Sequence, residues 1–338
     1  MRILLVNHEF TMSGAAVSLL KIADYLARSG HDCAVFPGRP STGPIEAEYV
    51  RRGIPIVHKA AFPEFAAVIC NTIRTGPLVT MAAPHTRTIW WLREAESGLE
   101  YLLTRPSIAM AFRDASIVVV QHEHQRDNVY RSFLYPRDPA TVLVVPNGFR
   151  IPRAGPTAAK ARPIRVIAVG SVYRLKRQGD LIRAIDRLGR SDIECVIIGN
   201  QIALEEEAQR IARAAPDQYR LLGQLPLDET LTWLRSSDIC CSSSRSESQS
   251  NVLFEAALTG NALVATDLPS HRGIWQNGEN ALLHPVGDVE ALARAITRLA
   301  DDVPLRHRLA DAAAVTASGF TEERLFANVD CVLAAACA

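Results

Sequence analysis

The chain alternates short aliphatic runs with longer stretches in which apolar residues recur every three or four positions. Residues 2–6 (RILLV) form the first aliphatic run, and a helical pattern follows from about 15 to 29. An unbroken aliphatic run of this length is typical of a strand that is buried on both faces, as in a parallel sheet. Strands that alternate with helices therefore predict an α/β fold with a doubly wound parallel sheet.

The alternation continues to about residue 148 and then begins again. In the first half we predict strands at 33–37, 54–57, 67–70, 88–92, 116–120 and 142–145, and helices at 43–52, 97–113 and 124–133. In the second half we predict strands at 165–170, 195–199, 219–223, 238–241 and 262–266, and helices at 178–190, 203–214, 228–236, 251–259, 288–301 and 304–314. Two such halves predict two Rossmann-like domains that face a central cleft, with ligands bound beyond the carboxyl ends of the strands.

A linker separates the two patterns. Residues 150–163 (RIPRAGPTAAKARP) contain three prolines and one glycine among small and basic residues, a composition typical of a segment between domains. We therefore predict an N-terminal Rossmann-like domain at 1–149, a linker at 150–163 and a C-terminal Rossmann-like domain at 164–320.

Composition excludes several classes of protein. Hydrophobic residues make up 48% of the 338 residues and charged residues 22%, so the chain can bury large cores and is neither disordered nor fibrous. The 37 basic and 36 acidic side chains nearly cancel, whereas a nucleic-acid-binding protein usually has a basic excess. We therefore expect no nucleic acid partner.

Cysteine spacing and the hydropathy of the start bear on the compartment. The seven cysteines include no CxxC pair, which favours free thiols in a reducing compartment. The first aliphatic run is shorter than the roughly 7–15 apolar residues of a secretory signal, and no run reaches the roughly 18 residues of a membrane span. We therefore expect a cytoplasmic protein that contacts the inner face of a membrane at most peripherally.

Several motifs of nucleotide and metal chemistry are absent from the sequence. It contains no GxGxxG, no GxxxxGK[ST], no GxSxG and no HExxH, so four common nucleotide-binding and hydrolase signatures are missing. No Asp-x-Asp pair occurs, which removes the metal-binding carboxylates of one large class of sugar transferases. His122-Glu123-His124 is interpreted as a solvated surface segment, because the two imidazoles would point apart. We expect no metal site.

The segment 242–267 carries the strongest candidate chemistry. Ser250, Asn251 and Val252 are predicted to form the first turn of a helix, where unpaired backbone N–H groups and a positive dipole end suit a phosphate. Glu247 precedes this turn, and Glu255 lies eight residues later, among apolar residues. Paired glutamates beside a helix are commonly solvated. A carboxylate in apolar surroundings, however, usually has an assigned partner, so these two could grip hydroxyl-bearing parts of one ligand.

A second candidate segment, 169–176 (VGSVYRLK), directly follows the first strand of the second half. Lys176 at its end could neutralise a diphosphate that the helix turn at 250–252 also holds. The alternative is a solvated lysine beside two arginines.

Together the two segments resemble the retaining glycosyltransferases of family four, which have the GT-B fold. The hallmark of that family is a glutamate, seven residues and a second glutamate, and Glu247-SQSNVLF-Glu255 has this spacing. EAALTGNALVATD and NGENALLHPVGD are also similar to family sequences, as are RILLVNHEF, SGHDCAVF and VVPNGF in the first half. The resemblance covers nearly the whole chain. It implies a GT-B fold in which residues 321–338 form a helix that crosses back to the N-terminal domain.

The resemblance also implies a role for each matching residue. Glu255 would hold the ribose of the donor, Glu247 would contact the donor sugar as a catalytic residue, and Lys176 would neutralise the diphosphate. Loops of both domains would complete the donor site through Gly14, Gly170, Ser171, Arg174, Ser250, Asn251 and Val252.

The chain departs from the family at several positions. Ser171 stands where the family often has an arginine, and Arg174 is the candidate to replace that phosphate contact. Arg93 stands where many relatives have a histidine in the cleft. An arginine cannot act as a base, but it can bind a phosphate or a sugar hydroxyl, so Arg93 is kept among the catalytic candidates.

The resemblance implies a retaining, metal-independent transfer of a sugar from a nucleotide-diphosphate sugar, in bacterial glycan or glycoconjugate biosynthesis. The donor would be a UDP-sugar or a GDP-sugar, and the acceptor a glycan, a lipid-linked molecule or a small metabolite. Lys176 and the helix dipole would stabilise the leaving nucleoside diphosphate without a cofactor.

Two alternatives stay open. A non-catalytic nucleotide- or sugar-binding protein could keep the fold without the missing arginine and histidine. A nucleotide-sugar epimerase would need acid and base groups around the sugar, for which Glu247 and His8 are candidates. Transfer needs an acceptor, epimerisation needs none, and a binding protein turns over no donor.

Overall fold

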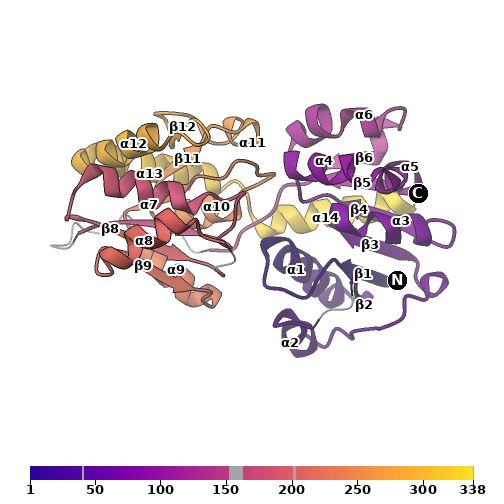
Figure 1. The fold of residues 1–338 in the computed structure, drawn as a ribbon. Helices are drawn as coiled ribbons and strands as arrows, with labels where there is room; N and C mark the ends of the chain where they lie inside the picture. The colour runs from indigo at the N-terminus through magenta and orange to yellow at the C-terminus, as the bar shows by residue number, and fades with distance from the viewer. Residues whose placement is uncertain (40–41, 152–162, 201–202, 338) are drawn as a thin grey trace. The chain divides into compact units, whose positions relative to one another are not determined.

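The computed structural model describes residues 1–39, 42–151, 163–200 and 203–337. The chain divides into two compact units, unit 1 (Met1–Gly148 with Glu322–Ala338) and unit 2 (Phe149–Thr321). Figure 1 is coloured by residue number, so unit 1 combines the indigo-to-magenta segments with the yellow C-terminal helix. The predicted linker at 150–163 lies largely outside the described residues.

Unit 1 is built on six parallel strands in the order β2-β1-β3-β4-β5-β6. The strands are β1 (Arg2–Asn7), β2 (Asp32–Pro37), β3 (Ala67–Asn71), β4 (Arg87–Trp91), β5 (Ile117–Val120) and β6 (Val142–Val144). They are connected by the helices α1 (Gly14–Arg28), α2 (Ile45–Arg51), α3 (Gly76–Ala82), α4 (Glu96–Leu103), α5 (Met110–Asp114) and α6 (Arg131–Leu134). Short 3-10 or π turns lie at Phe62–Glu64, Ile73–Thr75, Pro106–Ala109, Gln125–Val129 and Pro139–Thr141.

Both faces of the unit 1 sheet are covered by helices. Leu5 belongs to a buried cluster with Leu19 of α1 and Val329 of α14 (Glu322–Cys337), on one face. Its neighbour Leu4 belongs to a second cluster with Phe112 of α5, on the other face. Because successive strand residues point to opposite faces, the unbroken aliphatic run of β1 feeds both clusters.

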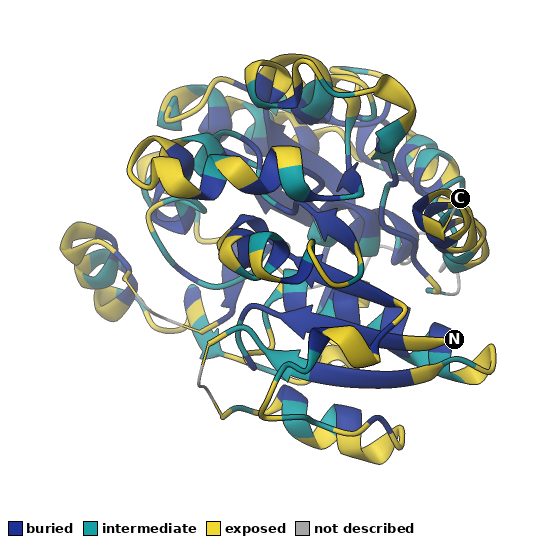
Figure 2. Ribbon diagram, turned by 90° about the vertical axis from the view of Figure 1, so that its right-hand side faces the viewer, coloured by how far each residue is buried: buried dark blue, intermediate teal, exposed yellow. Residues whose placement is uncertain are grey.

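Unit 2 repeats the architecture with six parallel strands in the order β12-β11-β10-β7-β8-β9. The strands are β7 (Ile164–Val169), β8 (Ile193–Ile198), β9 (Tyr219–Gly223), β10 (Ile239–Ser242), β11 (Ala262–Thr266) and β12 (Leu282–His284). The helices are α7 (Gln178–Leu188), α8 (Glu206–Ala214), α9 (Leu227–Arg235), α10 (Asn251–Leu258), α11 (Pro269–Arg272), α12 (Val289–Asp301) and α13 (Val303–Ala317). Figure 2, which faces unit 1, shows buried strands and helices that turn exposed faces outward.

The two ends of unit 2 lie side by side. Phe149 donates its backbone N–H to the Phe320 carbonyl at 2.9 Å, and an isolated bridge pairs Phe149 with Thr321. The chain then continues into α14, whose residues belong to unit 1.

The predicted pair of doubly wound parallel sheets is confirmed, whereas several local predictions are wrong. The predicted strand at 54–57 is reduced to a single bridge between Val35 and Ile56. The predicted helix at 97–113 breaks into three pieces around Pro106, because proline lacks an N–H and restricts the residue before it. The short elements α3, α11 and β12 were not predicted. The predicted cleft between the halves stays a prediction.

Two further observations concern the cysteines and the helices. All seven cysteines are free, and five of them are buried. In the part of the chain that the structure describes, no helix is both long enough and apolar enough to span a membrane.

Candidate functional site

The loop after β7 meets the end of β8 at the carboxyl edge of the unit 2 sheet. Gly170 directly follows β7, and a Cβ atom on Gly199, at the end of β8, would lie 2.0 Å from the Gly170 carbonyl oxygen. The backbone N–H of Gly170 donates to the Ile198 carbonyl oxygen at 2.8 Å, and that of Val172 donates to the Asn200 carbonyl oxygen at 2.8 Å. Glycine at 199 therefore permits a close approach that fixes the path of the loop.

Lys176 and Glu247 join the loops after β7 and β10. Lys176 Nζ donates to Glu247 Oε1 at 2.5 Å, and Ser244 Oγ donates to the same oxygen at 2.7 Å. Arg245 also donates its backbone N–H to the Leu175 carbonyl at 2.8 Å. The two side chains are only 25% and 10% exposed, so the structure brings together the lysine and the first glutamate of the sequence motif.

The electrostatics of this pair keep both groups charged. Burial raises the pKa of Glu247, but the Lys176 charge and the hydrogen bonds from Lys176 and Ser244 outweigh it, so the net pKa lies below its usual range. Burial lowers the pKa of Lys176, but the Glu247 carboxylate and Tyr173 outweigh it, so the net pKa lies above its usual range. A nearby opposite charge favours the ionised form of each partner.

His271 is a buried imidazole beside this pair that the sequence reasoning missed. It lies in α11, after β11, and its Nδ1 is 2.8 Å from the Thr266 carbonyl oxygen. A carbonyl can only accept, so Nδ1 carries the hydrogen and Nε2 is left as an acceptor. Nε2 is buried and has no hydrogen-bond partner among the described residues. Burial lowers the pKa of His271, which favours this neutral form.

The start of α10 lies in the same part of unit 2. Ser250 precedes the helix and makes no side-chain capping bond. Its buried Oγ has no hydrogen-bond partner within the described part of the chain. The first turn, Asn251 and Val252, is half-buried. The Ser250 side chain therefore does not cap this helix start, whose positive dipole end favours an anion.

The second glutamate of the motif lies further along α10. Glu255 is half-buried, and its carboxylate adds to the effect of burial in raising the pKa of the Cys240 thiol on β10. It therefore lies close enough to β10 for its charge to act on that thiol.

Two of the predicted donor contacts in the β7 loop are not built into this network. Ser171 accepts a bond from Gln178 Nε2 through its carbonyl oxygen at 3.1 Å. Arg174 is exposed. Its expected role in place of the missing arginine stays a prediction.

Unit 1 places Arg93 and Gly14 at the carboxyl edge of its own sheet. Arg93 follows β4, and its Nε and Nη1 donate to Asn71 Oδ1 at 2.9 Å and to Asn147 Oδ1 at 2.8 Å. Its guanidinium carbon lies 4.7 Å from the Trp91 ring centroid. Burial lowers its pKa to about 9, so the group is still a cation at neutral pH. Gly14 is the first residue of α1.

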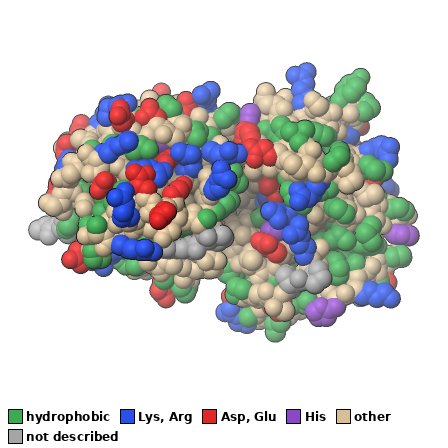
Figure 3. Space-filling view, in the orientation of Figure 1, with side chains coloured by type: hydrophobic (Ala, Val, Ile, Leu, Met, Phe, Trp, Pro, Cys, Tyr) green, Lys and Arg blue, Asp and Glu red, His purple; other side chains and the backbone are tan. Residues whose placement is uncertain are grey.

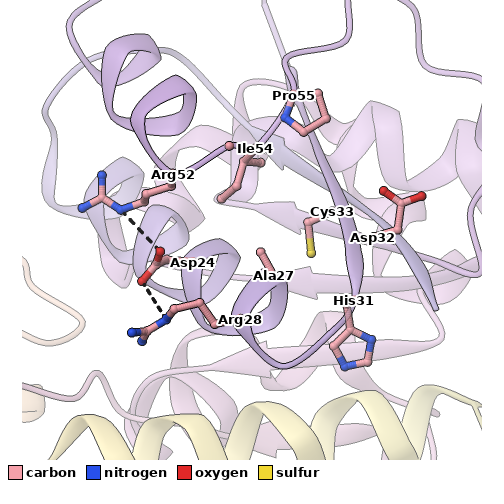
Figure 4. Close-up of a pocket in the computed structure, with 10 residues that line it drawn as sticks. Asp24, Ala27, Arg28, His31, Asp32, Cys33, Arg52, Ile54 and Pro55 are labelled. Atoms are coloured by element: carbon pink, nitrogen blue, oxygen red, sulfur yellow. Dashed lines mark ion pairs between the residues drawn. The ribbon is translucent and has the colours of Figure 1, made fainter.

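The cavity drawn in Figure 4 does not coincide with these residues. It has a volume of about 350 Å³ and is lined by Asp24, His31, Asp32, Arg52 and six neighbouring residues. Asp32 begins β2, so the cavity lies at the opposite edge of the unit 1 sheet. Asp24 pairs with Arg28 and Arg52 at 3.3 Å and 3.7 Å, and the charges of the cavity thus largely satisfy one another.

No cluster in the described ranges resembles a metal centre. Among those residues, no three His, Cys, Asp or Glu side chains lie close enough to hold a metal ion.

Comparison with known proteins supports the interpretation of unit 2. Residues 163–302 match the family described as "Glycosyl transferases group 1". Over 124 residues the chain is 34% identical to a phosphatidyl-myo-inositol mannosyltransferase of Mycobacterium leprae, a match covering 36% of this chain and 33% of that protein. Over 208 residues it is 29% identical to a D-inositol 3-phosphate glycosyltransferase of Kribbella flavida, covering 55% and 49% of the two chains. The matches thus span a third to a half of these relatives.

The fold is similar to solved structures over its whole length. Anabaena Alr3699/HepE, solved in complex with UDP-glucose, superposes with a TM-score of 0.84 at 17% identity and covers 99% of both chains. The chain therefore has the two-domain, Rossmann-like GT-B fold that its sequence predicts.

Proposed function

We propose that the protein is a retaining, metal-independent glycosyltransferase that moves a sugar from a nucleotide-diphosphate sugar to an acceptor hydroxyl. The observation that carries this proposal is the Lys176–Glu247 pair beside the uncapped start of α10. These groups lie within the segment that matches the group 1 glycosyltransferases. A fixed cation beside a helix start that has no side-chain cap, at one sheet edge, suits a diphosphate.

The transfer step follows from the charge that the leaving group gains. The bond between the acceptor oxygen and the anomeric carbon forms as the bond from that carbon to the β-phosphate oxygen breaks. The acceptor's proton passes to a phosphate oxygen of the leaving nucleoside diphosphate. Lys176 and the N–H groups at Asn251 and Val252 stabilise the negative charge on the departing diphosphate. Fixed dipoles of this kind need no rearrangement during the reaction.

The remaining polar groups bind the donor. In this proposal, Glu247 and the Nε2 acceptor of His271 bind hydroxyls of the donor sugar, and Glu255 binds the ribose. A carboxylate and a neutral imidazole both accept hydrogen bonds from hydroxyls. Unit 2 is thus the donor side and unit 1 the acceptor side, where Arg93 offers a buried cation.

The substrates are proposed from the same chemistry and from the relatives. The donor is a UDP-sugar or a GDP-sugar, since HepE was solved with UDP-glucose and the Mycobacterium leprae relative is a mannosyltransferase. The acceptor is a glycan, a lipid-linked molecule or a small polyol, and the pathway is bacterial glycan or glycoconjugate biosynthesis.

Thermal unfolding in the presence of nucleotides tests the donor site. The purified protein is heated with EDTA and with UDP, GDP, ADP or one of their sugars, because a ligand of the folded state raises Tm by mass action. We expect one nucleotide class to raise Tm and the same class to support sugar transfer. A protein that binds a nucleotide but never turns over its sugar is a binding protein. A protein that binds none has no donor site, and the proposal fails.

A further inference from the structure

Glu94 is a carboxylate at the carboxyl edge of unit 1 that has no role in the proposed donor site. It follows the buried Arg93 in the loop after β4. Its Oε2 accepts the backbone N–H of Ile73, in the loop after β3, and that of Arg93, each at 3.0 Å. The side chain therefore joins the loops that follow two adjacent strands.

The second carboxylate oxygen of Glu94 is open. In the part of the chain that the structure describes, no other residue donates a hydrogen bond to Oε1, since both bonds fall on Oε2. Glu94 is half-buried, and Oε1 is not one of the fully buried atoms that lack a partner. It is therefore accessible to solvent and free to accept a hydrogen bond from a ligand.

The backbone of Glu94 is held as firmly as its side chain. Its carbonyl oxygen accepts from Gln125 Nε2 and from Tyr130 Oη, each at 2.8 Å. A Cβ atom on Gly98, in the first turn of α4, would lie 2.9 Å from Glu94 Cβ and would overlap the Tyr130 hydroxyl. Glycine at this position thus lets α4 pack closely against Glu94. The orientation of Oε1 is set before any ligand binds, which lowers the entropy cost of binding.

The charges around Glu94 favour an uncharged partner for Oε1. Burial raises its pKa, and the backbone hydrogen bonds and the charge of Arg74 oppose this, but the net pKa lies above its usual range. The charge of Glu94 also acts on the buried Arg93 guanidinium. Two cations thus already face one carboxylate, so an ammonium group would add a third positive charge and an anion would be repelled by Oε1. A hydroxyl can donate to Oε1 with neither cost.

Local structure alone does not require a carboxylate at position 94. A glutamine would accept the two N–H groups of Ile73 and Arg93 through its amide oxygen, and it would place no charge in a partly desolvated site. Basic side chains gather beside acidic ones on the face of unit 1 in Figure 3, so charges on this face commonly have a charged neighbour. The open oxygen of Glu94 is the feature that a structural role leaves unexplained.

We propose that Glu94 Oε1 binds a hydroxyl of the acceptor other than the hydroxyl that reacts. This inference rests on the proposed function, because it assigns a contact with the acceptor of that reaction. Ligands of parallel sheets bind beyond the carboxyl ends of the strands, where Glu94 lies. The proton of the reacting hydroxyl passes to the leaving diphosphate, so Glu94 orients a second hydroxyl and is not the base. The acceptor is thus a neutral sugar residue, either free or at the end of a glycan.

A Glu94→Gln variant reverses the polarity of the open position. The two backbone N–H groups need an acceptor, so the amide oxygen takes the place of Oε2 and the NH₂ group takes the place of Oε1. With a donor that raises Tm, sugar transfer to the methyl α-glycosides of glucose, mannose, galactose and maltose is compared with donor hydrolysis. We expect the ratio of transfer to hydrolysis to fall about tenfold, with Tm and donor KM unchanged. A fall in Tm with an unchanged ratio assigns a structural role and overturns the inference.

A matched control is available in the same unit. Glu64 is an exposed glutamate that precedes β3, at the opposite edge of the sheet, and pairs with Arg2. Glu64→Gln makes the same chemical change away from the carboxyl ends of the strands, so it should leave the ratio of transfer to hydrolysis as it is in the wild type. An equal fall in both variants would contradict a contact at Glu94.

Acceptors that lack one hydroxyl show whether the contact is direct. Monodeoxy derivatives of the glycoside that the wild type uses best, each retaining the reacting hydroxyl, are compared in the wild type and Glu94→Gln. Loss of one particular hydroxyl should lower kcat/KM about tenfold in the wild type and hardly at all in the variant, because its partner is already gone. Equal losses in both proteins at every position overturn the inference, as does donor hydrolysis without transfer to any of these glycosides.

The same panel distinguishes the two sources of the sugar residue. A higher kcat/KM for the maltoside than for the single-residue glycosides assigns the end of a glycan, and equal values assign a free sugar. A protein that binds no donor, or never turns one over, instead removes the proposed function itself.

Discussion

Lys176 and Glu247 belong to loops that follow different strands of one sheet, yet Nζ and Oε1 lie 2.5 Å apart with both side chains largely buried. β7 and β10 are adjacent in that sheet, so their carboxyl ends bring the two loops together. The pair satisfies each ion before any ligand arrives. A bound diphosphate and sugar would then compete for groups that are already charged and oriented, which is the condition for electrostatic preorganisation.

Replacing Lys176 should lower both the free energy of unfolding and the rate of turnover. Lys176→Ala leaves the Glu247 carboxylate buried without its cation, and we expect a loss of about 3 kcal/mol in the free energy of unfolding. Turnover should fall about a hundredfold or more, since the leaving group loses its cation. Urea unfolding and steady-state kinetics measure the two effects. Lys59→Ala, at an exposed lysine, is the control, and equal losses in both variants would contradict the role of Lys176.

The free energy of unfolding at acidic pH should depend on the protonation of Glu247. Its pKa is lowered in the folded protein, so its contribution is present above the ordinary carboxyl pKa of about 4.3 and is lost as the pH falls toward the folded value. Unfolding free energies of the wild type and Glu247→Gln should therefore differ most near pH 7 and converge below about pH 4. A difference that grows on acidification would show that the carboxylate is not stabilised by its partners.

The second glutamate should act on binding alone. Glu255→Ala should weaken binding of the nucleoside diphosphate about tenfold, the loss of one hydrogen bond to a charged group. It should leave kcat nearly unchanged, because the ribose lies away from the reacting carbon. Calorimetric titration measures the affinity. Glu290→Ala, an exposed glutamate on α12, serves as the matched control, and a fall in kcat without a loss of affinity would argue against a ribose contact.

The close approach at the end of β8 provides a backbone test. In Gly199→Ala the new Cβ would lie 2.0 Å from the Gly170 carbonyl oxygen, so the β7 loop must move. We expect a loss of about 2–3 kcal/mol of stability and weaker nucleotide binding. Gly223→Ala also changes a residue with positive φ but meets no atom within 4 Å. The Gly223→Ala variant should lose less stability and keep its nucleotide binding. Similar losses of binding in both variants would show that the contact with Gly170 is not the cause.

The sheets were predictable because a strand covered on both faces is apolar over most of its length, as β3 is before Asn71 and β11 before Thr266. Elements that depend on tertiary pairing were not. Val35 donates its N–H to the Pro55 carbonyl, and its own carbonyl accepts a bond from the Val57 N–H. No continuous ladder forms, because Pro55 has no N–H to donate. Local composition does not distinguish such a singly bridged segment from a short strand.

The candidate site, like the fold, was predictable from the sequence only in part. The spacing of Glu247 and Glu255 is a property of the sequence, and so is the position of Lys176 after the first strand of its half. His271 matters because the fold leaves its Nε2 buried and unsatisfied among the described residues. That property depends on which carbonyl lies near the imidazole, and it cannot be predicted from the residues next to His271 in the chain.

The placement of α14 has a consequence for synthesis on the ribosome. Leu325, Val329 and Val332 complete the apolar cluster that also contains Leu19 of α1, but the whole of unit 2 is translated between them. Unit 2 has its full set of elements as soon as Thr321 leaves the exit tunnel, with its two ends already bridged. Unit 1 must wait with one sheet face incompletely covered, so the N-terminal half of this protein is the later of the two to mature.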